Sequence, residues 1–229
     1  MDVLELERFL VERRGGAHTL ELPGGDVREV LVVAQGLGDG YFILPLTVGD
    51  YIAQGGIKKL DTSHAAFKDA ERECSSRLDK LLAVKGKRSA DSIWKELGQI
   101  LWDNCGMQRS KESLELALSK IPPLREEFWK HVKVLGTADG LNQELEKANR
   151  VADFLEFGEL LCADALHRNE SCGGHFRTEY QTPDGEAKRN DAEFAYVAAW
   201  QWKGENQKPE LHKEPLAFEN IQLATRSYK

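Results

Sequence analysis

Apolar residues recur at intervals of three and four through the middle of the chain, which is the period of an amphipathic α-helix. The clearest stripe contains Phe67, Ala70, Cys74, Leu78 and Leu81. Serine, glycine and proline divide the pattern into segments that start and stop like helices. We therefore predict helices over residues 63–84, 89–105, 110–121, 124–135 and 141–167. Because their connections are short, neighbouring helices are expected to run antiparallel and to form a bundle.

Two places in this apolar pattern contain residues that disfavour helix. Pro122 and Pro123 lack a backbone N–H, and we expect them to end one helix before the next begins. Residues 35–53 are apolar but glycine-rich, and each glycine costs a helix about 1 kcal/mol relative to alanine. We interpret residues 35–53 as a tightly packed core helix, in which glycine lets another backbone come close. Pro45 is expected to kink it.

The C-terminal part changes period. Phe194, Tyr196, Ala198, Trp200 and Trp202 alternate strictly with other residues, which predicts a strand with one aromatic face. A polar loop over 203–209 leads to a second extended stretch over 210–218, and this pattern predicts a hairpin. The fold class expected is therefore mainly α: a helical bundle over 60–170 with a small β tail over 171–229.

Composition and charge exclude several classes of protein. The 229 residues contain 31 Lys and Arg against 38 Asp and Glu, and the net charge of -7 disfavours binding to nucleic acid. No apolar run reaches the roughly 18 residues of a membrane-spanning helix. The N-terminus has no signal-peptide core. Four separated cysteines without a CxxC pair favour reduced thiols in a cytosolic protein.

Polar residues that could carry chemistry are densest over 167–177. His167, Cys172 and His175 could ligate zinc, but nothing supplies a fourth ligand at a recognisable spacing. A Cys172 nucleophile with His175 as base would need an adjacency that sequence does not show. We favour a structural interpretation, in which Arg168 and the charges after it pair around a Gly-Gly turn at a helix end. Gly36, Gly38 and Gly40 resemble half of a dinucleotide fingerprint without its strand–turn–helix context.

From Gln35 onward, the chain resembles the C-terminal portion of the flavoprotein subunit of succinate dehydrogenase and fumarate reductase. The resemblance depends on several segments along the chain. They are the helix over 35–45, the segments LREEFWK over 124–130 and LNQELEK over 141–147, the element RNESCGGHFR over 168–177, and the terminal LHKEP over 211–215 and RSYK over 226–229. The family form of that element is Arg-x-Glu-Ser-x-Gly-x-His-x-Arg, which gives Arg168, Glu170, Ser171, His175 and Arg177.

The resemblance implies an oxidoreductase context. The family transfers hydride between succinate and fumarate at FAD and passes electrons to an iron–sulfur subunit and a membrane anchor. It implies FAD in the full-length family and none bound by this chain alone. It also implies an iron–sulfur subunit and a flavin-binding portion as partners, and a cytoplasmic protein held peripherally at the inner face of the membrane through an anchor subunit. The element over 168–177 is expected at an interface with one of those partners.

The resemblance weakens before residue 35. The family has Gly-Ala-Asn-Arg-Leu-Gly just ahead of the matching helix, and its arginine binds the substrate carboxylate. Here that position falls on Val27, and Arg28 lies one residue out of register, which turns a helical side chain by about 100°. We therefore assign no catalytic, cofactor-binding or metal-binding residue. Residues 1–33 are expected to be an unmatched, non-homologous leader, and residues 34–59 a remnant of the last helix of the FAD domain.

Two functions follow from these expectations. The first is a C-terminal piece of a succinate dehydrogenase or fumarate reductase flavoprotein that is inactive alone. The alternative is a stand-alone helical module that docks on an iron–sulfur or flavin subunit. Exposed apolar surface distinguishes them, because a piece that normally packs on a missing domain exposes apolar side chains that a self-sufficient module would bury.

Overall fold

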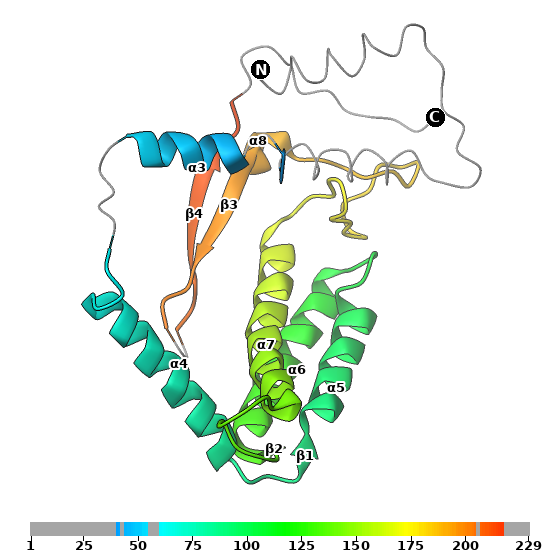
Figure 1. The fold of residues 1–229 in the computed structure, drawn as a ribbon. Coiled ribbons are helices and arrows are strands. Elements are labelled where there is room, and N and C mark those ends of the chain that lie inside the picture. Colours follow the sequence, from blue (N-terminus) through cyan, green and yellow to red (C-terminus); the bar gives the residue numbers. More distant parts are fainter. Residues whose placement is uncertain (1–39, 42–43, 55–59, 205–206, 218–229) are drawn as a thin grey trace, which may run out of the picture. The chain divides into compact units, whose positions relative to one another are not determined.

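The structure, a computed structural model, describes residues 40–41, 44–54, 60–204 and 207–217. The chain divides into two compact units, Met1–His64 and Ala65–Lys229. Figure 1 traces the order of the elements along the chain. The expected leader over 1–33, with Val27 and Arg28, lies outside the described residues.

The first unit contains helix α3 (Leu44–Ala53). Pro45 is tolerated as its second residue, because the N–H groups of a first turn have no partner inside the helix. The expectation of a tightly packed core helix is wrong for Leu44–Ala53, since no residue of α3 is buried. Its large apolar side chains, from Leu44 to Ile52, are exposed.

The second unit is built on four long helices, α4 (Ala65–Ala83), α5 (Ala90–Asn104), α6 (Lys111–His131) and α7 (Gln143–His167). Helices α5, α6 and α7 pack side by side, with α6 antiparallel to the other two (Figure 1). Their predicted starts are confirmed, because Ser89, Ser110 and Asn142 each accept a hydrogen bond from an N–H in the first turn.

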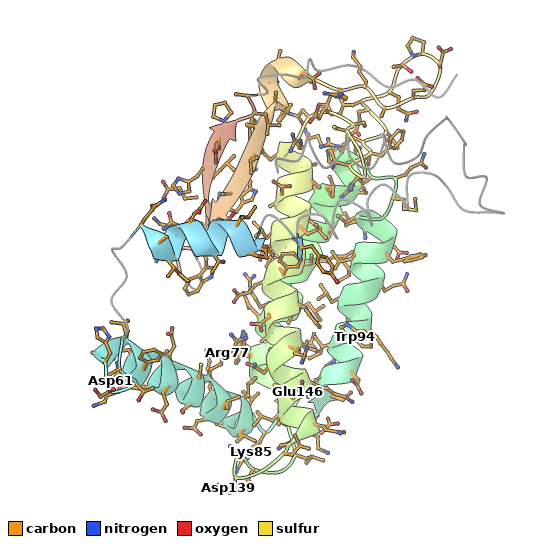
Figure 2. All side chains as sticks on the ribbon, turned by 45° about the horizontal axis from the view of Figure 1, so that its top comes forward. Asp61, Arg77, Lys85, Trp94, Asp139 and Glu146 are labelled. Carbon is orange, nitrogen blue, oxygen red and sulfur yellow. The ribbon has the colours of Figure 1, made fainter. Side chains whose placement is uncertain are left out.

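The core lies between α5, α6 and α7, where the predicted stripes meet. Its members are apolar side chains with almost no exposed surface, among them Ile93, Leu97, Leu114, Ile121, Phe128 and Leu155. Helix α4 contributes only Leu81 among its buried residues, and Phe67 at its other end is 49% exposed. Arg77 of α4, labelled in Figure 2, donates to the Asp153 carboxylate of α7. The predicted stripe on α4 is therefore helical but mostly exposed.

The two prolines do not separate two helices. Pro122 and Pro123 lie inside α6, which continues from Lys111 to His131. The helix tolerates the missing N–H groups because Ile121, Leu124 and Phe128 on both sides of the prolines are buried in the core. Packing of these apolar side chains outweighs the intrinsic cost of proline, which is about 3 kcal/mol in an unsupported helix.

Short strands complete the second unit. Strand β1 (Arg88–Ser89) pairs in parallel with β2 (Val132–Lys133), joining the start of α5 to the end of α6. Strands β3 (Tyr196–Gln201) and β4 (Glu210–Pro215) form an antiparallel pair after the short helix α8 (Asp191–Phe194), which confirms the predicted hairpin. The fold is therefore mainly α with a small β-hairpin, as the sequence predicted.

The aromatic face of β3 is tied to the end of α7. The indole Nε1 of Trp200 donates to the Asp164 carboxylate at 2.6 Å, and the His167 ring lies 3.0 Å from the Tyr196 hydroxyl. Phe194 and Tyr196 are buried. The hairpin thus packs on the last turn of α7, next to the polar element at residues 168–177.

Candidate functional site

The segment after α7 contains three of the buried polar side chains among the described residues. Glu170, Ser171 and Arg177 are each at most 2% exposed. A buried charge is costly unless it is paired and hydrogen-bonded. The partners of these side chains therefore define what the segment does.

Glu170 is held by two groups from different parts of the chain. Its Oε1 accepts from Nε of Arg168 at 2.8 Å, and its Oε2 accepts from the backbone N–H of Asn190 at 2.8 Å. Arg168 also donates through Nη2 to the carbonyl of Phe194 at 2.7 Å. The carboxylate and the guanidinium thus connect the end of α7 to helix α8, and the charge pairing expected around this turn is present.

Arg177 binds the C-terminus of α7. Its Nη1 donates to the carbonyls of Ala165 at 3.0 Å and Leu166 at 3.2 Å. The last carbonyls of a helix have no partner within it, and a cation there also complements the negative end of the helix dipole. Ser171 fixes the backbone of Arg177, because its Oγ accepts from the Arg177 N–H at 2.8 Å.

Glu179 links Arg177 to the next helix. Its carboxylate accepts from Nε and Nη2 of Arg177 at 3.3 and 3.2 Å, and from the backbone N–H of Lys111 in the first turn of α6. Burial raises the pKa of the Glu179 carboxyl, but the hydrogen bonds from Arg177 and Lys111 outweigh it and lower the pKa below 4.5. The pair thus joins the C-terminus of α7 to the N-terminus of α6.

His175 lies in the turn between these charges. Its Nε2 is 2.9 Å from the carbonyl of Arg168, an arrangement that needs the tautomer with a proton on Nε2. Burial lowers the pKa of His175 below 6.5; the hydrogen bond to the Arg168 carbonyl opposes this shift, and the positive charges of Arg109, Arg177 and Arg168 add to it. The surroundings therefore disfavour the charged imidazolium.

The structure shows the contacts of His167, Cys172 and His175, which the sequence offered as zinc ligands or as a nucleophile with its base. His167 lies against Tyr196, and His175 lies against Arg168, so both rings have other partners. Cys172 and His175 are joined through their backbones, at 2.8 and 3.0 Å. Across residues 40–41, 44–54, 60–204 and 207–217, no group of three His, Cys, Asp or Glu side chains could hold a metal ion.

Sequence reasoning missed the partners that come from far along the chain. The backbone at Arg109 forms a parallel β-bridge with the backbone at Arg177. The Arg109 side chain also donates through Nη2 to the carbonyl of Gly174 at 3.0 Å. Lys111 supplies a backbone N–H to the Glu179 carboxylate, and Asn190 supplies one to the buried Glu170 carboxylate. No spacing within 168–177 could have revealed them, because they belong to other elements.

The arrangement is a scaffold for a turn. The charged side chains point inward and are paired, while Gly173, which has a φ of +58°, and Gly174 are exposed at its tip. Arg177 and Glu179 do line an open polar pocket together with Lys111, Glu112, Glu115 and Asn169. Both cations in that pocket are already matched, Arg177 by Glu179 and Lys111 by Glu115, so the pocket offers no uncompensated charge for an anion.

Comparison with known proteins places this scaffold in a family. The family model described as fumarate reductase flavoprotein C-term matches residues 94–228. The fumarate reductase flavoprotein subunit of Haemophilus influenzae is 25% identical over 187 residues, which cover 81% of this chain and 30% of that protein. The corresponding subunit of Proteus vulgaris is 29% identical over 133 residues, covering 58% and 21%.

Solved structures show the same fold. A quinol–fumarate reductase with menaquinol molecules superimposes with a TM-score of 0.59 at 22% identity, over 74% of this chain and 28% of that one. The E. coli quinol fumarate reductase gives a TM-score of 0.57 at 20% identity, over 76% and 28%. The chain thus spans less than a third of the length of these relatives.

Proposed function

The chain belongs to the fumarate reductase flavoprotein C-terminal family, and on this basis we propose that it acts as the C-terminal domain of a succinate–fumarate oxidoreductase. In this proposal, hydride transfer takes place at an FAD held by a flavin-binding portion outside the described helices. The chain supplies no reacting group and is inactive alone. Its role is to pack on that portion and on an iron–sulfur subunit.

The observation that carries the proposal is the exposed apolar surface of α3. Leu44, Leu46, Val48, Tyr51 and Ile52 are each more than half exposed. A short helix with this many exposed apolar side chains is characteristic of a surface that another protein segment covers. This supports the first of the two functions considered from the sequence, in which the helix packs on a flavin-binding domain.

The element over 168–177 is proposed to contribute to the same assembly. Glu170, Ser171 and Arg177 are buried, so they act by holding the turn that presents Gly173 and Gly174. In our proposal this turn contacts the flavin-binding portion or the iron–sulfur subunit. We further propose that an anchor subunit holds this complex at the cytoplasmic face of the membrane. No helix in the described part of this chain is both long and apolar enough to cross a membrane.

Flavin content and succinate–acceptor activity of the purified 229-residue chain test the proposal. We expect a colourless protein without activity, because the chain brings no reacting group to a flavin. A yellow, active protein would overturn it.

Self-association tests the role of α3. We expect sedimentation to show concentration-dependent association that Leu46→Glu abolishes, because burial of the apolar side chains of α3 drives it. Leu135→Glu is the matched control, since Leu135 is equally exposed but lies outside α3. A strictly monomeric chain that binds an isolated iron–sulfur subunit would instead favour the stand-alone docking module.

A further inference from the structure

We propose that Cys105 and Cys162 form a thiol modification site, in which a hydroperoxide oxidises Cys105 and Cys162 then closes a disulfide. The site lies where the C-terminal end of α5 meets α7. It is independent of the proposed oxidoreductase function, because it needs neither FAD nor a partner subunit.

The packing of α5 on α7 brings the two cysteines together. The two helices run parallel, since each is antiparallel to α6 (Figure 1). A methyl group added at Gly158 of α7 would lie 3.4 Å from Cδ1 of Leu101 on α5, so the helices approach closely there. Cys162 and Cys105 each lie four residues beyond this contact, which is about one helical turn on the same faces.

The two cysteines differ in their access to solvent. Cys162 has no exposed surface and belongs to the bundle core. Cys105 is half-buried and is the C-cap residue of α5, where the backbone leaves the helix. A small oxidant can therefore reach Cys105 but not Cys162, and the end of α5 can adjust to close a bond because helix ends fray.

Arg109 supplies a positive charge to the accessible thiol. Its Nη1 donates to Sγ of Cys105 at 3.5 Å, while Nη2 is fixed by the carbonyl of Gly174. Nε of Arg109 is buried without a hydrogen-bond partner among the described residues, so its charge is only partly compensated. A thiol beside such a guanidinium favours the thiolate, which is the nucleophile in cysteine chemistry.

The charge states follow from this environment. The hydrogen bond from Cys162 lowers the pKa of Cys105 to about 6; burial opposes that shift, and Arg109 adds to it. The same hydrogen bond raises the pKa of Cys162, as do burial and the negative charges of Cys105 and Glu159, with Arg109 opposing. The environment thus favours the thiolate at the accessible Cys105 and the thiol at the buried Cys162.

The chemistry balances with hydrogen peroxide as the oxidant. The Cys105 thiolate attacks one peroxide oxygen, so that an S–O bond forms as the O–O bond breaks. Hydroxide is the leaving group, and Cys105 becomes a sulfenic acid. The Cys162 sulfur then attacks the Cys105 sulfur, the S–O bond breaks, and the thiol proton leaves with the hydroxyl as water. Two electrons pass from the two sulfurs to the peroxide.

Differential alkylation of the unmodified chain tests the first step without any variant. At limiting iodoacetamide and neutral pH, we expect Cys105 to be labelled several-fold faster than Cys74, although Cys74 is exposed and Cys105 is half-buried. Exposure alone would give the opposite order. Equal or slower labelling of Cys105 would overturn the proposal.

Peptide mapping after treatment with stoichiometric hydrogen peroxide tests the second step. We expect a linked peptide that joins Cys105 to Cys162 and is lost on reduction. Cys162→Ser should instead trap a sulfenic acid on Cys105 that dimedone labels, whereas the matched control Cys74→Ser should still form the link. A link from Cys105 to Cys172, or no link at all, would show that Cys105 and Cys162 are not a redox pair.

Discussion

Two regions of the second unit bury side chains almost completely, by different means. Between α5, α6 and α7 the buried groups are apolar, as at Phe128 and Leu155. Around residues 168–179 they are charged or polar, as at Glu170, Ser171 and Arg177. Apolar burial is non-directional, so another apolar side chain of similar volume can substitute at modest cost. Charged burial depends on each partner lying in one place, so loss of a single partner leaves the other unpaired.

The largest effect is expected in the apolar region. Phe128→Ala should lower the free energy of unfolding by about 3–5 kcal/mol, because it removes a fully buried ring and leaves a cavity. Chemical denaturation monitored by far-UV circular dichroism measures it. Phe67→Ala on α4 is the matched control, since that ring is 49% exposed, and its cost should be much smaller. Equal costs at the two positions would contradict the placement of the core.

In the charged region, substitution of Arg177 should lower the free energy of unfolding by nearly as much. Arg177→Met should cost about 3 kcal/mol, because it removes the buried cation that pairs with Glu179 and donates to the carbonyls of Ala165 and Leu166. The same denaturation experiment measures it. Arg72→Met is the control, because the Arg72–Asp69 pair is solvent-exposed and contributes about 0–1 kcal/mol. If Arg177→Met were as mild as the control, the region would not depend on directional partners.

The smallest effect is expected in the pH dependence of the free energy of unfolding, which should come from the charged region and not from the apolar core. The pKa of His175 in the folded chain lies below 6.5, the ordinary value that applies to the unfolded chain. At a pH between these two pKa values, the unfolded chain therefore binds a proton at His175 that the folded chain does not bind. Stability should therefore fall as pH drops from 6.5 toward the folded pKa. Unfolding measured between about pH 5 and 8 should show this slope, reduced in His175→Gln and retained in Phe128→Ala. A slope unchanged by His175→Gln would place the titrating group elsewhere.

The helices were predictable because their signals are local. Ser89, Ser110 and Asn142 mark the helix starts, and apolar residues at intervals of three and four mark the faces that meet in the core. The prediction was wrong at Pro122 and Pro123, where burial of the residues around them keeps one helix continuous. It was also wrong about the burial of Leu44–Ala53, because an apolar sequence does not say whether another segment covers it.

The candidate element at 168–177 was found from its residues, but its partners were not. Glu170 is satisfied by Asn190, and the Arg177–Glu179 pair is completed by the backbone of Lys111. These contacts join residues 20 or 68 positions apart. Arg109 and the Cys105–Cys162 pair were likewise visible only once α5 and α7 were packed. Whether the turn at Gly173 and Gly174 contacts a partner stays a prediction.

The sequence by itself determined most of the helix starts, the hairpin and the family, because caps, periodicity and short motifs are properties of neighbouring residues. Only the tertiary structure decided which apolar faces are covered, which charges are neutralised and which thiols meet. The physical reason is that burial and pairing depend on distances between elements, and those distances are set by the packing of the whole unit rather than by any one segment.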